Sequence, residues 1–159
     1  MGSVIVAFSG GIDSSLVLKL AHDELGAQAV GITAVSPTLP ASELDATQKI
    51  AAEIGARHRI VETDQLQIPE FVLNDATRCY HCKTDLYSLL ETLRSEYVDG
   101  YIVDGTNVDD LGDDRPGLKA ARERGVRSPL LEAGFSKADI RDVARELHLS
   151  NWDKPAAAC

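Results

Sequence analysis

Short apolar runs alternate with longer amphipathic segments along most of this chain, and the alternation limits the folds open to it. The pattern predicts strands at residues 3–8, 29–35, 57–62, 101–104 and 127–130, and helices at residues 14–25, 41–54, 68–74, 83–95, 118–124 and 136–147. When a helix follows each strand, successive strands lie parallel and the helices cover both faces of the sheet. We therefore predict an α/β fold built on a doubly wound parallel sheet.

Length and composition restrict the class of protein. The 159 residues, of which 44% are hydrophobic and 26% charged, suit one globular domain with a sizeable core. A net charge of −9 argues against nucleic-acid binding by this segment, because a nucleic-acid backbone is bound by a basic surface. No apolar run approaches the length of a membrane span, so we expect a cytoplasmic protein without a membrane partner.

The first predicted strand runs into a glycine-rich loop, Ser9-Gly10-Gly11-Ile12-Asp13-Ser14. A strand, a glycine turn and a helix in succession present backbone N–H groups to a phosphate, and glycine lets the backbone approach an anion closely. The spacing is neither that of the Walker loop nor that of the G-x-G-x-x-G fingerprint. We predict a phosphate-binding loop; the alternative is a plain Gly-Gly turn followed by an Asp or Ser helix cap.

Side chains in and beside this loop suggest what it binds. The hydroxyls of Ser9, Ser14 and Ser15 can donate hydrogen bonds to phosphate oxygens, and the positive end of the following helix points at the same place. Asp13 would repel a phosphate unless a cation lay between them, and Mg²⁺ bridges carboxylate and phosphate oxygens. We therefore predict that Asp13 binds Mg²⁺ together with the phosphates.

The loops after the other strands are candidates as well, because doubly wound sheets bind ligands at the carboxyl ends of their strands. Gly105 permits close approach, while Thr106 and Asn107 offer hydrogen bonds to a nucleotide held by residues 9–14. Residues 33–40 are expected to recognise adenine through backbone amides. Four acidic residues farther along are either Mg²⁺ ligands or solvated turn residues: Asp109, Asp110, Asp113 and Asp114. Arg115 either binds a phosphate of the substrate or offsets these negative charges.

The cysteines form the second unusual feature. Cys79 and Cys82 flank Tyr80-His81 directly before Lys83, and Cys159 is the last residue. Such a pair suits a metal, a redox disulfide or an iron–sulfur cluster, and His81 and Cys159 could complete a zinc site. Unreactive, half-buried thiols beside an ordinary surface lysine remain the structural alternative. Because a protein rarely ends on its own third cysteine, we expect the chain to be a piece of a longer one.

Several runs together resemble the LarE family, the ATP-dependent sulfur transferases of nickel-pincer cofactor biosynthesis. They lie at residues 9–14, 78–87, 104–117 and 154–159. The loop alone resembles the pyrophosphate loop (PP-loop) of the wider ATP pyrophosphatase superfamily, which cuts ATP between the α and β phosphates. The resemblance covers essentially the whole chain. It implies a domain similar to the adenine nucleotide alpha hydrolases (HUP class) over residues 1–159, lacking the C-terminal part of the family.

The resemblance implies a reaction in two steps. ATP adenylylates a carboxylate of pyridinium-3,5-biscarboxylic acid mononucleotide, and sulfur then displaces AMP to leave a thiocarboxylate. In one branch of the family the cysteine corresponding to Cys159 sacrifices its sulfur; in another, three cysteines hold a 4Fe-4S cluster that carries the sulfur. With Cys79, Cys82 and Cys159, this chain resembles the cluster branch. Lys83 corresponds to an active-site lysine whose charge would stabilise the adenylate, and the full-length protein is expected to be a homo-oligomer.

Other functions fit the loop. A tRNA-thiolating enzyme also combines a PP-loop with cysteines, although the negative charge counts against it. An ammonia-dependent amidotransferase of the NAD or GMP synthase type needs no cysteine pair. A non-catalytic ATP- or AMP-binding module of the universal-stress type would release no pyrophosphate. The cysteines favour sulfur transfer to a small molecule.

Overall fold

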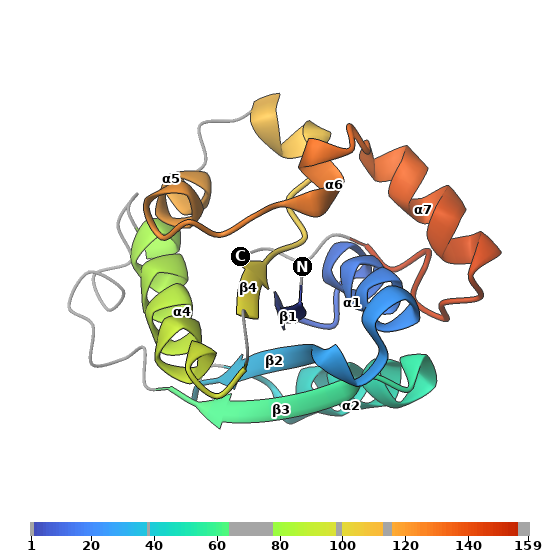
Figure 1. Cartoon of the computed structure of the whole chain (residues 1–159). Helices are drawn as coiled ribbons and strands as arrows, with labels where there is room; N and C mark the ends of the chain where they lie inside the picture. Colours follow the sequence, from blue (N-terminus) through green and yellow to red (C-terminus); the bar gives the residue numbers. More distant parts are fainter. Residues whose placement is uncertain (1, 38, 64–77, 98–99, 113–115, 156–159) are drawn as a thin grey trace.

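The computed structural model describes residues 2–37, 39–63, 78–97, 100–112 and 116–155, and strands alternate with helices in it (Figure 1). The strands are β1 (Ser3–Ala7), β2 (Ala29–Val35), β3 (Arg57–Glu62) and β4 (Gly100–Val103). The helices are α1 (Ile12–Leu25), α2 (Ala41–Ile54), α4 (Arg78–Arg94), α5 (Pro116–Glu123), α6 (Pro129–Glu132) and α7 (Lys137–Glu146). Short 3₁₀ turns, η1 (Gly26–Gln28) and η3 (Val108–Gly112), complete the described elements.

The described strands form one parallel sheet in the order β3-β2-β1-β4. Ile5 of β1 lies opposite Val30 of β2 on one side and opposite Ile102 of β4 on the other. The chain thus moves outward from β1 through β2 to β3, and then returns to the far side of β1 to form β4. This reversal beside β1 is the topological switch point at which doubly wound sheets bind ligands.

Alternate residues of β1 point to two apolar cores, one on each face of the sheet. Val4 and Val6 pack in a cluster with side chains of α1, α2 and α7. Ile5 and Ala7 pack in a second cluster with side chains of α4 and α5. This period of two is the pattern of a strand buried on both faces. The predicted doubly wound sheet, with helices on both faces, is confirmed (Figure 1).

One predicted strand is wrong, and one predicted helix lies outside the described residues. Instead of a strand at residues 127–130, Arg127 forms a single parallel bridge with Val103, and α6 begins at Pro129. Proline has no N–H for a sheet ladder, and its fixed φ suits the first turn of a helix. The helix predicted at residues 68–74 lies outside the described residues.

The predicted start of the helix at residues 83–95 is also corrected. Helix α4 begins at Arg78 rather than at residue 83, so Cys79 and Cys82 lie within the helix and not before it. No glycine or proline interrupts residues 78–83, so nothing there stops the helix from extending. Helix α2 spans the predicted residues, and its N-cap is Pro40. Ser136 and Asp139 form a capping box at the start of α7, within the helix predicted at residues 136–147.

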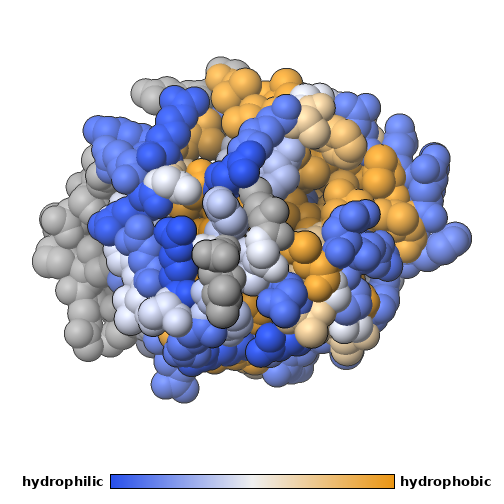
Figure 2. All heavy atoms as spheres, in the orientation of Figure 1, coloured by the Kyte–Doolittle hydropathy of each residue, from blue (hydrophilic) through white to orange (hydrophobic). Residues whose placement is uncertain are grey.

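The surface of this fold is mixed. In the view of Figure 2, hydrophilic atoms cover the side formed by α4 and α5, whereas apolar atoms reach the surface around α6 and α7. None of the helices among the described residues combines the length and the apolar composition that a membrane crossing requires.

Candidate functional site

The glycine-rich loop connects β1 to α1 at the carboxyl edge of the sheet. Gly10 has φ +82°, and a Cβ atom at this position would lie 2.5 Å from Oγ1 of Thr47 in α2. The Thr47 hydroxyl lies 2.8 Å from the carbonyl oxygen of Glu43 and 3.2 Å from that of Ser9. Both the backbone angle and the close contact require glycine at position 10.

The serines predicted to bind phosphate differ in accessibility. Ser9 is exposed, and its hydroxyl accepts a hydrogen bond from the backbone N–H of Gly11 at 3.3 Å. The Ser14 side chain is buried beneath the loop, where its hydroxyl accepts from the N–H of Ser9 at 3.2 Å. Ser15 is fully buried. In this structure only Ser9 presents its hydroxyl at the surface, while Ser14 and Ser15 hold the loop from below.

Asn151 supports the loop from a distant part of the chain. Its Nδ2 donates to the carbonyl oxygen of Gly10 and to the hydroxyl of Ser15, both at 3.0 Å. The segment that carries it is fixed in turn by Arg141, which donates to the carbonyl oxygens of Trp152 (2.8 Å) and Lys154 (3.0 Å). Sequence reasoning missed Asn151, because no local pattern links two groups 141 residues apart.

Asp13, the predicted Mg²⁺ ligand, lies in the first turn of α1 and forms an ion pair with Lys137 at the start of α7. The Lys137 ammonium lies 2.8 Å from Oδ1 and 2.9 Å from Oδ2 of Asp13. The backbone N–H of Lys137 also donates to Oδ2 of Asp109, at 2.8 Å. Among the described residues, no cluster of three or more His, Cys, Asp or Glu side chains could hold a metal ion. Lys137, like Asn151, was not predicted from the sequence.

The loop after β4 packs directly on the start of α1. A Cβ atom on Gly105 would lie 2.8 Å from the backbone nitrogen of Ser14 and 3.0 Å from the carbonyl carbon of Asp13. No side chain fits between the two segments, so this position requires a glycine. The fold thus brings residues 104–107 and 9–14 together, as expected from the ends of two neighbouring strands.

Asp104 anchors this second loop. Its buried carboxylate accepts hydrogen bonds from the hydroxyl of Ser128 (2.7 Å), the hydroxyl of Tyr87 (2.9 Å) and the backbone N–H of Thr106 (3.1 Å). Asn107 is also buried, and its Oδ1 accepts from the N–H of Asp109 at 2.9 Å. Both carboxylate oxygens of Asp104 and Oδ1 of Asn107 are therefore engaged in hydrogen bonds that shape the loop.

Tyr87 also links this loop to the part of α4 that carries the cysteine pair. The Lys83 ammonium lies 5.9 Å from the centroid of the Tyr87 ring, a cation–π distance, and the Tyr87 hydroxyl contacts Asp104. Cys79 and Cys82 belong to the first turns of the same helix. Cys159, and the acidic pair at residues 113 and 114 with Arg115, lie outside the described residues.

A hollow of about 470 Å³ lies where β2 and β3 end, lined by Val35, Ser36, Pro37, Glu62 and Thr63. The segment expected to recognise adenine thus borders an open space beside the loop-bearing strands. Farther down β2, Thr33 donates to the carbonyl oxygen of Phe8 and lies 2.7 Å from Nε2 of His58. Burial lowers the pKa of His58 below its usual value.

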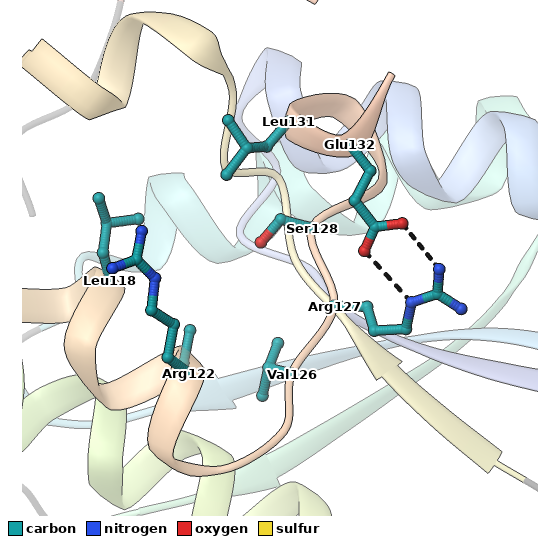
Figure 3. Close-up of a pocket in the computed structure, with 8 residues that line it drawn as sticks. Leu118, Arg122, Val126, Arg127, Ser128, Leu131 and Glu132 are labelled. Carbon is teal, nitrogen blue, oxygen red and sulfur yellow. Dashed lines mark hydrogen bonds and ion pairs between the residues drawn. The ribbon is translucent and has the colours of Figure 1, made fainter. Parts of the chain in front are cut away.

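A second hollow, of about 200 Å³, lies between α5 and α6 (Figure 3). Arg127 and Glu132 form a two-pronged ion pair at its edge, with N–O distances of 3.2 and 2.7 Å. Hydrogen bonding to Arg127 lowers the pKa of Glu132, and hydrogen bonding to Glu132 raises the pKa of Arg127. None of the residues predicted to bind ATP or metal lines this hollow.

The chain is similar to several known proteins. It is 47% identical over 155 residues to the uncharacterized protein slr1717 of Synechocystis, covering 98% of this chain and 58% of that protein. It is 41% identical over 155 residues to the pyridinium-3,5-bisthiocarboxylic acid mononucleotide synthase of Lactiplantibacillus plantarum, covering 97% of this chain and 56% of the synthase. The resemblance expected from the sequence is therefore confirmed, and the chain spans somewhat more than half the length of these relatives.

Solved structures with the same fold include two nucleotide-forming enzymes. An NH3-dependent NAD synthetase from Campylobacter jejuni matches with a TM-score of 0.76 at 19% identity, covering 99% of this chain and 70% of that one. An NMN synthetase from Francisella tularensis matches with a TM-score of 0.76 at 13% identity, covering 98% and 66%. At these identities the likeness establishes the fold alone. The family model described as asparagine synthase matches residues 2–94, which hold the glycine-rich loop and most of the sheet, and the chain therefore belongs to the asparagine synthase family.

Proposed function

We propose that this chain forms the ATP-using part of a sulfur transferase that acts on a pyridinium mononucleotide. The enzyme would adenylylate a carboxylate of pyridinium-3,5-biscarboxylic acid mononucleotide, release pyrophosphate, and replace oxygen by sulfur with loss of AMP. The observation that carries the proposal is the 41% identity, over nearly the whole chain, to pyridinium-3,5-bisthiocarboxylic acid mononucleotide synthase. We further propose that the full-length protein is a cytoplasmic homo-oligomer.

For ATP, the proposed ligands are the loop at residues 9–14 and the loop of Gly105, Thr106 and Asn107. The contact between Gly105 and the start of α1 supports a joint site, because both loops border one helix N-terminus. Backbone N–H groups and the positive end of a 14-residue helix favour an anion there. The hollow beside Val35 and Pro37 leaves room for the adenine next to these loops.

Asp13 is the proposed Mg²⁺ ligand, and its surroundings are compatible with a cation. Mg²⁺ usually binds one or two carboxylates and takes its other ligands from water and substrate phosphates, so a single aspartate beside a phosphate loop is enough. Both oxygens of Asp13 already contact the ammonium of Lys137, so a positive charge is accommodated at this carboxylate. The metal would neutralise charge on the phosphates and keep Asp13 from repelling them.

For the sulfur, the proposed residues are Cys79, Cys82 and Cys159. Three thiolates suit a 4Fe-4S cluster with one open iron, and such a cluster would supply a renewable carrier of sulfide. Cys79 and Cys82 lie about one helical turn apart in α4, and this spacing is compatible with both residues binding the same cluster. The alternative is sacrifice of Cys159, which would allow one turnover. Lys83 would stabilise charge on the adenylate.

The test is a reaction of the protein with Mg²⁺, ATP and the pyridinium dicarboxylate mononucleotide. We expect AMP, pyrophosphate and a thiocarboxylate product in equal amounts after anaerobic reconstitution with iron and sulfide. Ser9→Ala should lower the rate of the reaction. The control is Ser95→Ala, at a serine directly after the end of α4, and this variant should react at the normal rate. Pyrophosphate release without any sulfur in the product would contradict sulfur transfer.

Two measurements separate the alternatives. Thiolated tRNA, formed in place of a thiolated mononucleotide, would show a tRNA-modifying enzyme. Full activity with ammonia after Cys79 and Cys82 are both changed to serine would show an amidotransferase. The mass of the peptide that contains Cys159 decides the sulfur source. Loss of H₂S from that residue after turnover indicates sacrifice of the cysteine, whereas an unchanged mass supports the cluster.

A further inference from the structure

One peptide group of the glycine-rich loop, between Gly10 and Gly11, is held in a fixed orientation from below. Its carbonyl oxygen accepts a hydrogen bond from Nδ2 of Asn151 at 3.0 Å. In a trans peptide the C=O and the N–H point in opposite directions. The N–H of Gly11 is therefore directed away from Asn151, and it donates to the hydroxyl of the exposed Ser9 at 3.3 Å.

Glycine on both sides leaves this peptide free to turn over unless something holds it. A half-turn of the peptide changes ψ of Gly10 and moves φ of Gly11 from −72° into the positive region, which glycine tolerates. After such a turn the carbonyl oxygen would face outward and repel a phosphate, and the N–H would be lost from the site. The hydrogen bond from Asn151 therefore favours the orientation that can bind an anion.

This hydrogen bond is kept although it leaves another polar atom of Asn151 unpaired. The residue is 8% exposed, and its Nδ2 also donates to the hydroxyl of Ser15 at 3.0 Å. Its Oδ1 is buried and has no hydrogen-bond partner among the described residues, which is unfavourable for a buried acceptor. Turning the side-chain amide over would place Oδ1 against the Gly10 carbonyl oxygen. The carbonyl of Gly10 therefore determines how the amide lies.

The segment that carries Asn151, residues 150–154, is attached to two helices as well as to the loop. Ser150 donates from its hydroxyl and its backbone N–H to the Glu53 carboxylate of α2, at 2.6 and 2.8 Å. Arg141 of α7 donates to two backbone carbonyl groups beyond Asn151. The sequence then continues to Cys159, one of the residues proposed for the sulfur. Asn151 thus joins the glycine-rich loop to the segment that precedes this cysteine.

We propose that Asn151 is a positioning residue of the anion site, which keeps the Gly11 N–H turned outward and couples the filling of the loop to the order of residues 150–154. An anion that binds the outward N–H stabilises the conformation in which Asn151 holds the Gly10 carbonyl. Because linked equilibria are reciprocal, the anion also stabilises the attachment of residues 150–154, by the same factor. The proposal rests on the proposed function, since it takes residues 9–14 to be a phosphate loop.

The first test is the affinity for inorganic pyrophosphate with Mg²⁺, measured by titration calorimetry. Asn151→Leu has a side chain of similar size without the donor, and we expect it to weaken binding about fivefold, the factor that corresponds to one hydrogen bond. The matched control is Ser150→Ala, which removes a hydrogen bond of the neighbouring residue to Glu53 and leaves Asn151 in place. Its affinity should stay within about twofold of the unchanged protein.

The second test needs no substitution. Hydrogen exchange of the backbone N–H groups of residues 150–154, followed by mass spectrometry, reports how often this segment detaches. Detachment withdraws Asn151 from Gly10, so saturating pyrophosphate should slow the exchange about fivefold, the same factor as the loss of affinity. In Asn151→Leu, pyrophosphate should leave the exchange unchanged. In Ser150→Ala the exchange should be faster, but pyrophosphate should still slow it.

Three results would overturn the proposal. Unchanged affinity in Asn151→Leu, with lowered thermal stability, would show that Asn151 only fastens the chain. Equal weakening in Asn151→Leu and Ser150→Ala would indicate a general loosening of the segment. Exchange that does not respond to pyrophosphate in the unchanged protein would exclude the coupling, even if Asn151→Leu failed to fold. If the unchanged protein bound no pyrophosphate, the proposed function would fail as well, whereas the three results above leave it standing.

Discussion

The two halves of the carboxyl edge of the sheet are built differently. At the ends of β1 and β4, buried polar groups and close backbone contacts hold the loops: Asp104 accepts three hydrogen bonds, and Asn151 binds under Gly10. At the ends of β2 and β3, the residues line an open hollow of about 470 Å³. A preorganised half beside an open half suits a ligand with a highly charged part and a larger, less charged part.

The largest effect is expected from breaking the anchor of the preorganised half. Asp104→Ala removes the acceptor of the buried Tyr87 hydroxyl and of two half-buried donors, the Ser128 hydroxyl and the Thr106 N–H. A hydrogen bond to a charged group is worth about 1.5–3 kcal/mol, and less where the donor can reach water, so we expect a loss of about 3–5 kcal/mol in the free energy of unfolding. Urea denaturation measures it.

The control for this anchor is Asp142→Ala. Asp142 is exposed, and its ion pair with Arg145 has an N–O distance of 3.8 Å. Its removal should change the free energy of unfolding by less than about 0.5 kcal/mol. Equal losses in the two variants would contradict the role assigned to Asp104.

A second prediction concerns the glycine of the loop. Gly10→Ala must accommodate a Cβ atom 2.5 Å from the Thr47 hydroxyl at φ +82°, whereas Gly134→Ala meets nothing within 4 Å at a similar φ of +76°. The backbone penalty of positive φ is common to both. We therefore expect Gly10→Ala to be less stable than Gly134→Ala by about 1–3 kcal/mol, the usual cost of overpacking, as measured by urea denaturation. If Gly10→Ala were no less stable than Gly134→Ala, the side chain of Thr47 in α2 would have to move aside without cost.

A third prediction tests the open half without disturbing the preorganised one. Val35→Trp adds bulk to the hollow at the ends of β2 and β3. We expect AMP binding to weaken about tenfold, equivalent to roughly 1.4 kcal/mol, while pyrophosphate binding stays unchanged. Titration calorimetry with the two ligands checks this.

The matched control is Leu20→Trp, at an exposed apolar position on α1 that does not line the hollow. It should bind both ligands normally. If Val35→Trp weakened pyrophosphate and AMP alike, the two halves of the edge would not be separate parts of the site.

The smallest effect is expected from His58, which lies near the start of β3 and contacts Thr33 of β2. Burial lowers its pKa in the folded protein, so between that value and the ordinary 6.5 the unfolded chain binds a proton that the folded protein does not. The stability contribution of neutral His58 is complete above pH 6.5 and is lost as the pH falls through the lowered value. His58→Gln should therefore show less loss of stability between pH 7.5 and 5.5 than the unchanged protein, as measured by urea denaturation; equal loss would contradict this.

Local patterns predicted much of the fold. The apolar run before Ser9 and the following glycines indicated the first strand, loop and helix, and Ser136 indicated the start of α7. The predicted strand at residues 127–130 failed because an apolar run does not reveal whether a neighbouring strand is available along its whole length. Pro129 removes one donor, and the chain forms a single bridge before turning into α6.

Neighbouring residues alone specify the alternation of strands and helices and the position of the glycine-rich loop. Both follow from neighbouring residues, through hydrophobic period and the backbone freedom of glycine. The contacts of Lys137 with Asp13 and of Asn151 with Gly10 depend instead on the packing of distant segments. Those contacts join residues more than 120 positions apart, and they exist because packing of α7 and the following turn against α1 brings their side chains to one edge of the sheet.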